Sequence, residues 1–270
     1  MKIGKITHPQ SAICTSDEHR IVVRGHDLTQ DLIGQVGFAD YFFLLLTGKR
    51  PNTAASAVLN ATLVAIAEHG LVPSVQAARM TLAAAPDAMQ GAVAAGILGC
   101  GSVILGASET AGRLFAQIDA ACASGGAHAG DLPGAALAAV TALRDNRQTI
   151  PGYGHPQHKS RDPRVASLFA VAERAGADMR FVAIAEAVEA AIPAVVGKAL
   201  KLNVSAAIPA VLLGVGFPLN ALKGVPMLAR TAGLIAHLSE EQETPIGFAL
   251  SYQATRELEY TGALPSSPSP

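Results

Sequence analysis

A glycine-rich segment near the middle of the chain ends in a histidine and is soon followed by an arginine. The segment is Pro151-Gly152-Tyr153-Gly154-His155, and Asp162-Pro163-Arg164 begins seven residues after the histidine. An imidazole has a pKa of about 6.5 in water, so it can donate or accept a proton near neutrality. A guanidinium keeps its charge and can hold a carboxylate with two parallel hydrogen bonds. The pairing predicts a site that binds a carboxylate and moves a proton, although the spacing alone is equally consistent with a turn that carries an exposed histidine.

The composition is that of a large globular protein. Half of the 270 residues are apolar, which is enough for a sizeable core in one large domain or two smaller ones. Lys and Arg together number 20, Asp and Glu together number 21, and no basic block occurs. The chain therefore lacks the electrostatic pattern of a nucleic-acid-binding protein.

Neither a disulfide framework nor a metal site is expected. The cysteines Cys14, Cys100 and Cys122 are far apart and form no C-x-x-C pair. His158 follows His155 by three residues, but no cysteine or carboxylate is arranged to complete a set of metal ligands. The first ten residues contain two lysines without a following apolar stretch, unlike a secretory signal peptide. We therefore predict a cytoplasmic protein without a bound metal.

One apolar run approaches the length of a membrane span, which is roughly 20 residues. It extends from Ser205 to Leu222 and is interrupted by Pro209, Pro218 and Asn220. Because proline ends or kinks a helix, and the neighbouring segments are amphipathic, we predict a buried helix followed by a turn and no membrane span.

Segments of helical period must position these residues. They are rich in alanine, and they are Ala54 to His69, Ser74 to Ala85, Asp87 to Leu98, Ser108 to Ala123, Pro133 to Asn146, Val165 to Gly176, Met179 to Val196 and Val225 to Glu241. Asp131 precedes one of them as a candidate cap, and Gly70 follows another as a candidate terminator. Only Arg20 to Arg24 is a short β-branched stretch. The fold class predicted is all-α.

The high content of alanine and glycine lets helix axes approach closely, which favours a layered bundle of many helices. A compositional bias of the source would also raise the alanine content, and it would leave the helical prediction unchanged. The last residues, 266–270, are of low complexity and are predicted to be a disordered tail.

Several segments, in order along nearly the whole chain, resemble the citrate synthase superfamily, especially its short members described as citryl-CoA lyases. The family motifs concerned are RGYD, LLLTG, DHG with AAR, the GPLHGGANE loop, PGYGHxxxKxxDPR, LNVD, and the carboxyl-terminal RPR and YTG segments. The matching segments here are Arg24-Gly25-His26-Asp27-Leu28, Leu44-Leu45-Leu46-Thr47-Gly48, Glu68-His69-Gly70, Ala77-Ala78-Arg79, Gly101 to Glu109, Pro151 to Arg164, Leu202-Asn203-Val204, Arg230-Thr231-Ala232-Gly233 and Arg256 to Gly262. A match that keeps its order is more specific than a single motif.

The resemblance implies an all-helical fold with a large dimer-forming domain and a small domain that closes over the substrate. By this analogy, residues 1–112 and 223–265 form the large domain and residues 113–222 the small one. Such enzymes form or cleave the carbon-carbon bond between the methyl group of acetyl-CoA and a keto-dicarboxylate. The implied partners are a coenzyme A thioester, a di- or tricarboxylate and a second copy of the chain, without a permanently bound cofactor.

The resemblance also assigns roles to single residues. His155 matches the histidine that protonates the keto oxygen or, in reverse, takes the hydroxyl proton. Arg164 and Arg230 match arginines that hold substrate carboxylates, and His69 matches a histidine that contacts oxaloacetate. Without the resemblance, the arginines would be interpreted as surface charges and His69 as a helix cap.

Further positions match the family's coenzyme A site and the polar lining of its cleft. Gly152, Tyr153 and Gly154 lie where the backbone approaches the adenine end of coenzyme A, and Lys159 occupies a basic position near the phosphates, unless it is merely solvated. Ser74 and Asn203 are candidates for polar lining.

Three positions depart from the family pattern. Ile104 replaces the second catalytic histidine, and Ser205 replaces the catalytic aspartate. In the family, these two groups form and stabilise the acetyl-CoA enolate, which isoleucine cannot do and serine without a base does poorly. The carboxyl-terminal arginine, which usually reaches the neighbouring subunit's site, is displaced by one residue, so that Glu257 stands at its spacing and Arg256 precedes it. The half of the site that binds the dicarboxylate is present, and the half that handles the enolate is missing.

Two classes of function are consistent with this pattern. The first is an enzyme, either a citryl-CoA lyase-like or citrate synthase-like protein, or a related one that binds an oxyacid and runs another reaction without coenzyme A. The second is a catalytically impaired homologue or a partner subunit that binds a di- or tricarboxylate. We favour the enzyme, because His155 together with Arg164 and Arg230 exceeds what a binding scaffold requires. The sequence does not specify the acyl group or the direction of the reaction.

Overall fold

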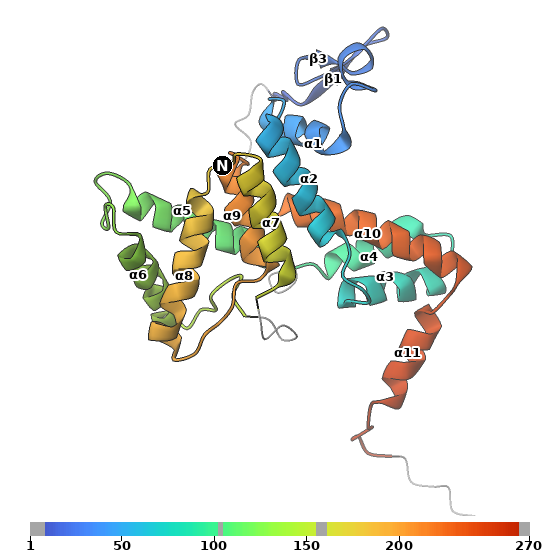
Figure 1. Cartoon of the computed structure of the whole chain (residues 1–270). Coiled ribbons are helices and arrows are strands. Elements are labelled where there is room, and N and C mark those ends of the chain that lie inside the picture. Colours follow the sequence, from blue (N-terminus) through green and yellow to red (C-terminus); the bar gives the residue numbers. More distant parts are fainter. Residues whose placement is uncertain (1–8, 102–104, 155–160, 265–270) are drawn as a thin grey trace, which may run out of the picture. The chain divides into compact units, whose positions relative to one another are not determined.

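The computed structural model describes residues 9–101, 105–154 and 161–264 (Figure 1). His155, His158, Lys159, Ile104 and the tail of residues 266–270 lie outside the described residues. The chain divides into two compact units. Unit 1 consists of residues 1–67 and 102–229, and unit 2 consists of residues 68–101 and 230–270. Helix α10 (Gly224–Glu243) begins in the first and ends in the second.

Unit 1 begins with a small antiparallel sheet. Its strands β1 (Cys14–Ser16), β2 (Ile21–Val23) and β3 (His26–Asp27) pair in sequence order. A π-helical turn (Leu28–Leu32) and helix α1 (Phe38–Thr47) follow, and Val23, Leu32 and Leu44 form a buried cluster. The sheet is tied to α1 because Arg24 donates from Nε to the carbonyl oxygen of Leu45 at 2.8 Å.

Unit 1 continues with several further helices. They are α2 (Thr53–Ala67), α5 (Ala107–Cys122), α6 (Leu132–Asp145), α7 (Pro163–Arg174), α8 (Arg180–Val196), α9 (Val204–Gly214) and the short 3-10 helix η2 (Leu219–Ala221). Helix α9 is apolar on nearly all sides and packs against α2, α5, α7 and α8 (Figure 1). A helix that is hydrophobic all round is one that is buried all round.

Unit 2 is built from the helix pair α3 (Pro73–Ala84) and α4 (Met89–Leu98), the second part of α10, and α11 (Gly247–Arg256). Its core comprises Val75, Ala78, Leu82, Ala92, Leu234 and Leu238. The packing is close, because a Cβ added at Gly96 would lie 2.7 Å from Leu234 Cδ1 and 2.8 Å from the carbonyl oxygen of Ser74. Small residues at such positions let the helices approach, as the composition predicted.

The fold class is confirmed, and every helical segment predicted from period is a helix whose ends agree to about two residues. The apolar run after Leu202 is indeed a buried helix followed by a turn. The predicted strand is β2, and its partners β1 and β3 were not predicted. Among the described residues, no helix combines the length and hydrophobicity needed to cross a bilayer. The closing domain of residues 113–222 stays a prediction.

Candidate functional site

The glycine turn before position 155 is held by the segment that leads into α9. Gly154 N donates to the carbonyl oxygen of Lys201 at 2.7 Å, and Asn203 N donates to that of Gly152 at 2.9 Å. Asn203 Nδ2 also donates to the carbonyl oxygen of Gly154 at 2.7 Å. Gly152 has φ 86°, and a Cβ there would lie 2.5 Å from Ala206 Cβ. Only glycine fits this close approach.

Tyr153 is buried in the same turn. Its hydroxyl donates to the carbonyl oxygen of Ala185 at 2.7 Å, so α8 fixes the ring. Burial, with a smaller contribution from the negative charge of Glu189, raises the pKa of the Tyr153 phenol well above its usual value. The phenol is therefore a neutral anchor, and it is the ring that is available to a ligand.

Glu189 of α8 contacts two segments of the chain that lie next to this turn. Its carboxylate pairs with Arg161 and lies 3.8 Å from Lys201 Nζ, and Oε1 accepts a hydrogen bond from Leu202 N at 3.3 Å. One carboxylate thus contacts Arg161, which follows the turn in the chain, and the segment 201–202, which bonds to the turn.

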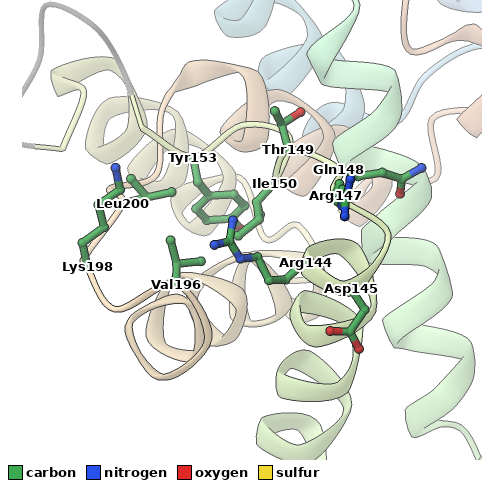
Figure 2. A pocket seen from close by; sticks show the side chains of 10 residues that line it. All are labelled: Arg144, Asp145, Arg147, Gln148, Thr149, Ile150, Tyr153, Val196, Lys198 and Leu200. Carbon is green, nitrogen blue, oxygen red and sulfur yellow. The ribbon is translucent and has the colours of Figure 1, made fainter.

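A cavity of about 750 Å³ lies against the ring of Tyr153 (Figure 2). Three of the side chains that line it are cationic, namely Arg144, Arg147 and Lys198, against a single acid, Asp145. The remaining lining residues are Gln148, Thr149, Ile150, Val196 and Leu200. Cations beside an apolar, aromatic wall suit an anionic ligand that also carries a flat or apolar group.

Arg164 is the second residue of helix α7, and its guanidinium is already paired. Nε donates to Asp162 Oδ1 at 3.0 Å and Nη2 donates to Asp162 Oδ2 at 2.7 Å, which is the bidentate arrangement. Burial raises the pKa of Asp162, but the hydrogen bonds and charge of Arg164 and the backbone N–H of Val204 lower it further, so the net shift is downward. The third nitrogen, Nη1, contacts the carbonyl oxygen of Ala65 at 3.4 Å. Arg164 would bind a ligand through Nη1 or after the ion pair opens.

Ser205 lies in the first turn of α9, whose N-cap is Asn203. Ser205 N donates to Asn203 Oδ1 at 2.9 Å, and the neighbouring Val204 N donates to Asp162 Oδ2 at 3.3 Å. Asp162 is therefore the carboxylate bonded to this turn, and its lowered pKa makes it a weak base.

In unit 2, His69 follows the end of α2 in a turn organised by Glu68. Glu68 Oε1 accepts hydrogen bonds from His69 N at 2.8 Å and Gly70 N at 2.5 Å, and Gly70 adopts φ 74°. Glu68 Oε2 lies 3.1 Å from His237 Nε2. The backbone of His69 is thus fixed by a carboxylate that is itself held by a histidine.

Arg230 is the one predicted site residue whose side chain is both charged and unsatisfied within the described part of the chain. It is 3% exposed, yet its Nε and Nη1 have no hydrogen-bond partner there. Burial raises the pKa of the Cys100 thiol, while the charge of Arg230 and the hydroxyl of Ser74 act to lower it, which places all three groups close together. An unsatisfied buried donor costs about 1–3 kcal/mol and more when it is charged. The arrangement suits a carboxylate ligand.

Arg256 ends α11 and is exposed. Its guanidinium lies 5.9 Å from the ring centroid of Tyr252, while Gln253 Nε2 donates to Glu257 Oε1 at 2.8 Å. Among the described residues, no group of three histidine, cysteine, aspartate or glutamate side chains is placed to hold a metal ion.

Comparison with known proteins identifies the family. The model of the citrate synthase C-terminal domain matches residues 19–247. The chain belongs to the citrate synthase family. It is 25% identical over 225 residues to a citrate synthase of Haloferax volcanii, covering 82% of this chain and 56% of that protein. The chain thus spans about half the length of the curated relatives it matches.

Among solved structures, the chain is similar to citryl-CoA lyase from Hydrogenobacter thermophilus. The TM-score is 0.83 at 32% identity, and the alignment covers 96% of this chain and 97% of that one. The fold is also similar to that of an ATP citrate lyase from Methanosaeta concilii in complex with (3S)-citryl-CoA, with a TM-score of 0.76 at 23% identity, over 97% of this chain and 43% of that one.

Sequence reasoning missed the cationic residues of the cavity, Arg144, Arg147 and Lys198. Two of them stand shortly before the glycine turn, where a basic segment could have been noticed, but Lys198 joins them only in the folded chain. Ser74 was predicted as polar lining, whereas Cys100 was treated only as a free thiol.

Proposed function

We propose that the chain is a citryl-CoA lyase-like enzyme, which cleaves or forms the bond between an acetyl-CoA unit and an oxaloacetate-like keto-dicarboxylate. The observation that carries this proposal is the buried guanidinium of Arg230, whose Nε and Nη1 lack partners in the described part of the chain. By the family resemblance, Arg230 matches an arginine that holds a substrate carboxylate. The similarity to citryl-CoA lyase over both full lengths supports the choice of reaction.

The cavity beside Tyr153 is proposed to take the nucleotide end of coenzyme A. Coenzyme A carries a ribose phosphate, a diphosphate and an adenine ring, so it needs cations and a flat apolar wall in one place. Arg144, Arg147 and Lys198 supply the former, and Tyr153 with Ile150 supplies the latter (Figure 2). Gly152, Gly154 and Lys159 keep their proposed place beside the same ligand.

Cleavage depends less than synthesis on the family histidine and aspartate, which are replaced here by Ile104 and Ser205. His155 is proposed to take the tertiary hydroxyl proton as the carbon-carbon bond breaks, which releases the acetyl-CoA enolate. That enolate can be protonated by water. In the synthetic direction, a base must remove a proton from the methyl group of acetyl-CoA. Neither Ile104 nor Ser205, which stand at the two positions that handle the enolate in the family, is such a base. Loss of one oxyanion donor alone reduces a rate by about 10² to 10³.

The alternative is a catalytically impaired homologue, a partner subunit, or an oxyacid enzyme that does not use coenzyme A. It is favoured by the substituted positions Ile104 and Ser205, and by the ion pair in which Asp162 occupies the fork of Arg164. A protein of this kind would bind citrate without turning over a thioester.

One experiment distinguishes the lyase from the alternative. The pure protein is incubated with citryl-CoA and, separately, with acetyl-CoA and oxaloacetate, while free thiol and oxaloacetate are measured. Turnover of citryl-CoA that disappears in His155→Ala supports the lyase. Citrate-dependent thermal stabilisation without turnover would establish the alternative. Ile104→His combined with Ser205→Asp should add synthase activity, since the pair restores both groups that handle the enolate.

Assembly and location are also proposals. A homodimer in the cytoplasm is supported by the exposed apolar side chains on α11, where Phe248 is 68% and Tyr252 65% exposed, and by the free cysteines Cys14, Cys100 and Cys122. Light scattering measures the mass of the assembly, and a monomer would contradict the dimer. A homologous partner chain would appear as a second protein in a purified native complex.

A further inference from the structure

A chain of polar contacts runs through unit 2 from a buried ion pair to the turn that carries His69. It begins at Arg79 of α3, which is 2% exposed. Arg79 Nε lies 2.6 Å from Glu241 Oε2, and Arg79 Nη1 lies 2.5 Å from Glu240 Oε2. Glu241 also accepts hydrogen bonds from the backbone N–H groups of Ile246 and Gly247. This half of the network connects α3, the end of α10 and the start of α11.

The other half of the network begins on the same guanidinium. Arg79 Nη1 lies 3.3 Å from Nδ1 of His237. A guanidinium nitrogen can only donate a hydrogen bond, so Nδ1 is the acceptor and carries no proton. The single ring proton of the neutral imidazole is therefore on Nε2, which lies 3.1 Å from Glu68 Oε2. Arg79 thus fixes the tautomer in which His237 donates to Glu68.

Glu68 connects His237 to the backbone of the turn that carries His69. Its other oxygen accepts hydrogen bonds from His69 N and Gly70 N, at 2.8 Å and 2.5 Å. Burial raises the pKa of Glu68, but the hydrogen bonds from His237, Gly70 and His69 lower it by more, so the carboxylate is kept ionised. The side chain of Glu68 is 47% exposed, hence the link contributes little to global stability.

We propose that Glu68 and His237 are positioning residues, which hold the turn so that His69 meets a di- or tricarboxylate ligand in one orientation. The proposal rests on the proposed function only in taking His69 as a ligand contact. The fold does not depend on this link, because the Arg79–Glu241 pair already joins the three helices. Loss of the link should therefore loosen the turn and weaken ligand binding while the core stays intact.

The test measures the citrate dissociation constant and the melting temperature of the full chain. Glu68→Gln and His237→Ala are expected to weaken citrate binding about tenfold, the lower end of the effect seen when a partner that orients a metal-binding side chain is removed. Both should melt within about two degrees of the wild type, since the altered side chains are not core residues. Glu243→Gln removes an exposed charge from the same helix and serves as the matched control.

Two further variants separate positioning from a general loss of packing. His237→Gln keeps an N–H that can donate to Glu68, and it should recover most of the affinity lost in His237→Ala. In a double-mutant cycle, Glu68→Gln should have little further effect once His69 is replaced by alanine, because the two act through one contact. Additive losses in that cycle, or wild-type affinity in Glu68→Gln, would overturn the proposal.

Failure of the proposed function gives a different result. If the wild type binds citrate but does not turn over citryl-CoA, the proposed lyase activity is wrong. The positioning proposal can still be tested, because its test measures binding. A wild type that binds neither citrate nor oxaloacetate overturns both.

Discussion

Arg164 in unit 1 and Arg230 in unit 2 are both predicted to hold substrate carboxylates, and their surroundings differ completely. Arg164 donates with a bidentate fork to Asp162 two residues earlier, so its charge is balanced within the chain. Arg230 is buried, and its Nε and Nη1 have no partner in the described residues. A matched ion pair is balanced within the fold, whereas an unmatched buried cation is a candidate for binding a ligand anion. We expect stability to depend on the first and ligand affinity on the second.

The largest effect is expected when the Asp162–Arg164 ion pair is broken, and it is a loss of stability of the fold. Asp162→Asn leaves Arg164 without its counter-charge next to the first turn of α9, and we expect a loss of about 3 kcal/mol in the free energy of unfolding. Urea unfolding followed by circular dichroism measures it. Glu173→Gln, which neutralises an exposed carboxylate on α7, is the control. A loss below 1 kcal/mol in Asp162→Asn would mean that the pair is as dispensable as a surface one.

Arg230→Met should show the reverse. Removing two donors to a ligand carboxylate is expected to weaken citrate binding about 100-fold, or about 2.7 kcal/mol. The ligand-free melting temperature should stay the same or rise, because an uncompensated buried charge is removed. Titration calorimetry and thermal melting measure the two quantities, with the exposed Arg174→Met as control. A fall of several degrees without ligand would show that Arg230 has a structural partner.

Acid should also distinguish the two arginines. The pKa of Asp162 is lowered in the folded chain, so its ionised form stabilises the fold at pH values above the ordinary aspartate pKa of about 3.9. This contribution is lost as the pH falls through the folded-state pKa. Stability measured between pH 6 and pH 3 should therefore fall less steeply in Asp162→Asn than in the wild type. Equal slopes would exclude Asp162 as the titrating group.

The smallest effects are expected at the cavity beside Tyr153. Arg147→Gln and Lys198→Gln should each weaken coenzyme A binding about threefold to tenfold, and the loss should shrink at high salt because both side chains are exposed. The wild type should bind coenzyme A without its ribose phosphate more weakly than it binds coenzyme A. A variant that has lost the cation facing this phosphate should bind the two compounds about equally. Unchanged affinity in both variants would locate the nucleotide elsewhere.

The helices were predictable because apolar spacing and terminators are local properties. Gly70 and Asp131 were both assigned from neighbours in sequence, and Asp131 indeed caps α6 through Gly134 N. The strands β1 and β3 were not predictable, since they contain serine, aspartate and histidine and are held by pairing with β2 and by Arg24, whose partner Leu45 lies 21 residues away. Helix α1 was not marked, because its end, Leu44-Leu45-Leu46-Thr47-Gly48, was interpreted only as a family motif.

The sequence named residues for the candidate site but did not indicate their state of pairing. The spacing of Asp162-Pro163-Arg164 could have indicated an N-cap with a local ion pair, but the resemblance directed attention to the substrate. The lack of partners for Arg230 Nε and Nη1 among the described residues depends on burial and on which side chains reach them, and neither property is encoded in the neighbouring sequence. Lys198 likewise joins Arg144 across more than fifty residues of chain.

The bond from the Tyr153 hydroxyl to Ala185 gives the molecule an internal optical signal. The chain has no tryptophan and four tyrosines, so its near-ultraviolet spectrum belongs to tyrosine. Since the pKa of Tyr153 is raised well above the usual value, its phenolate band is delayed in an alkaline titration until the glycine turn comes apart. The last step in phenolate absorbance therefore reports the opening of that turn, in the unmodified protein and without an added dye.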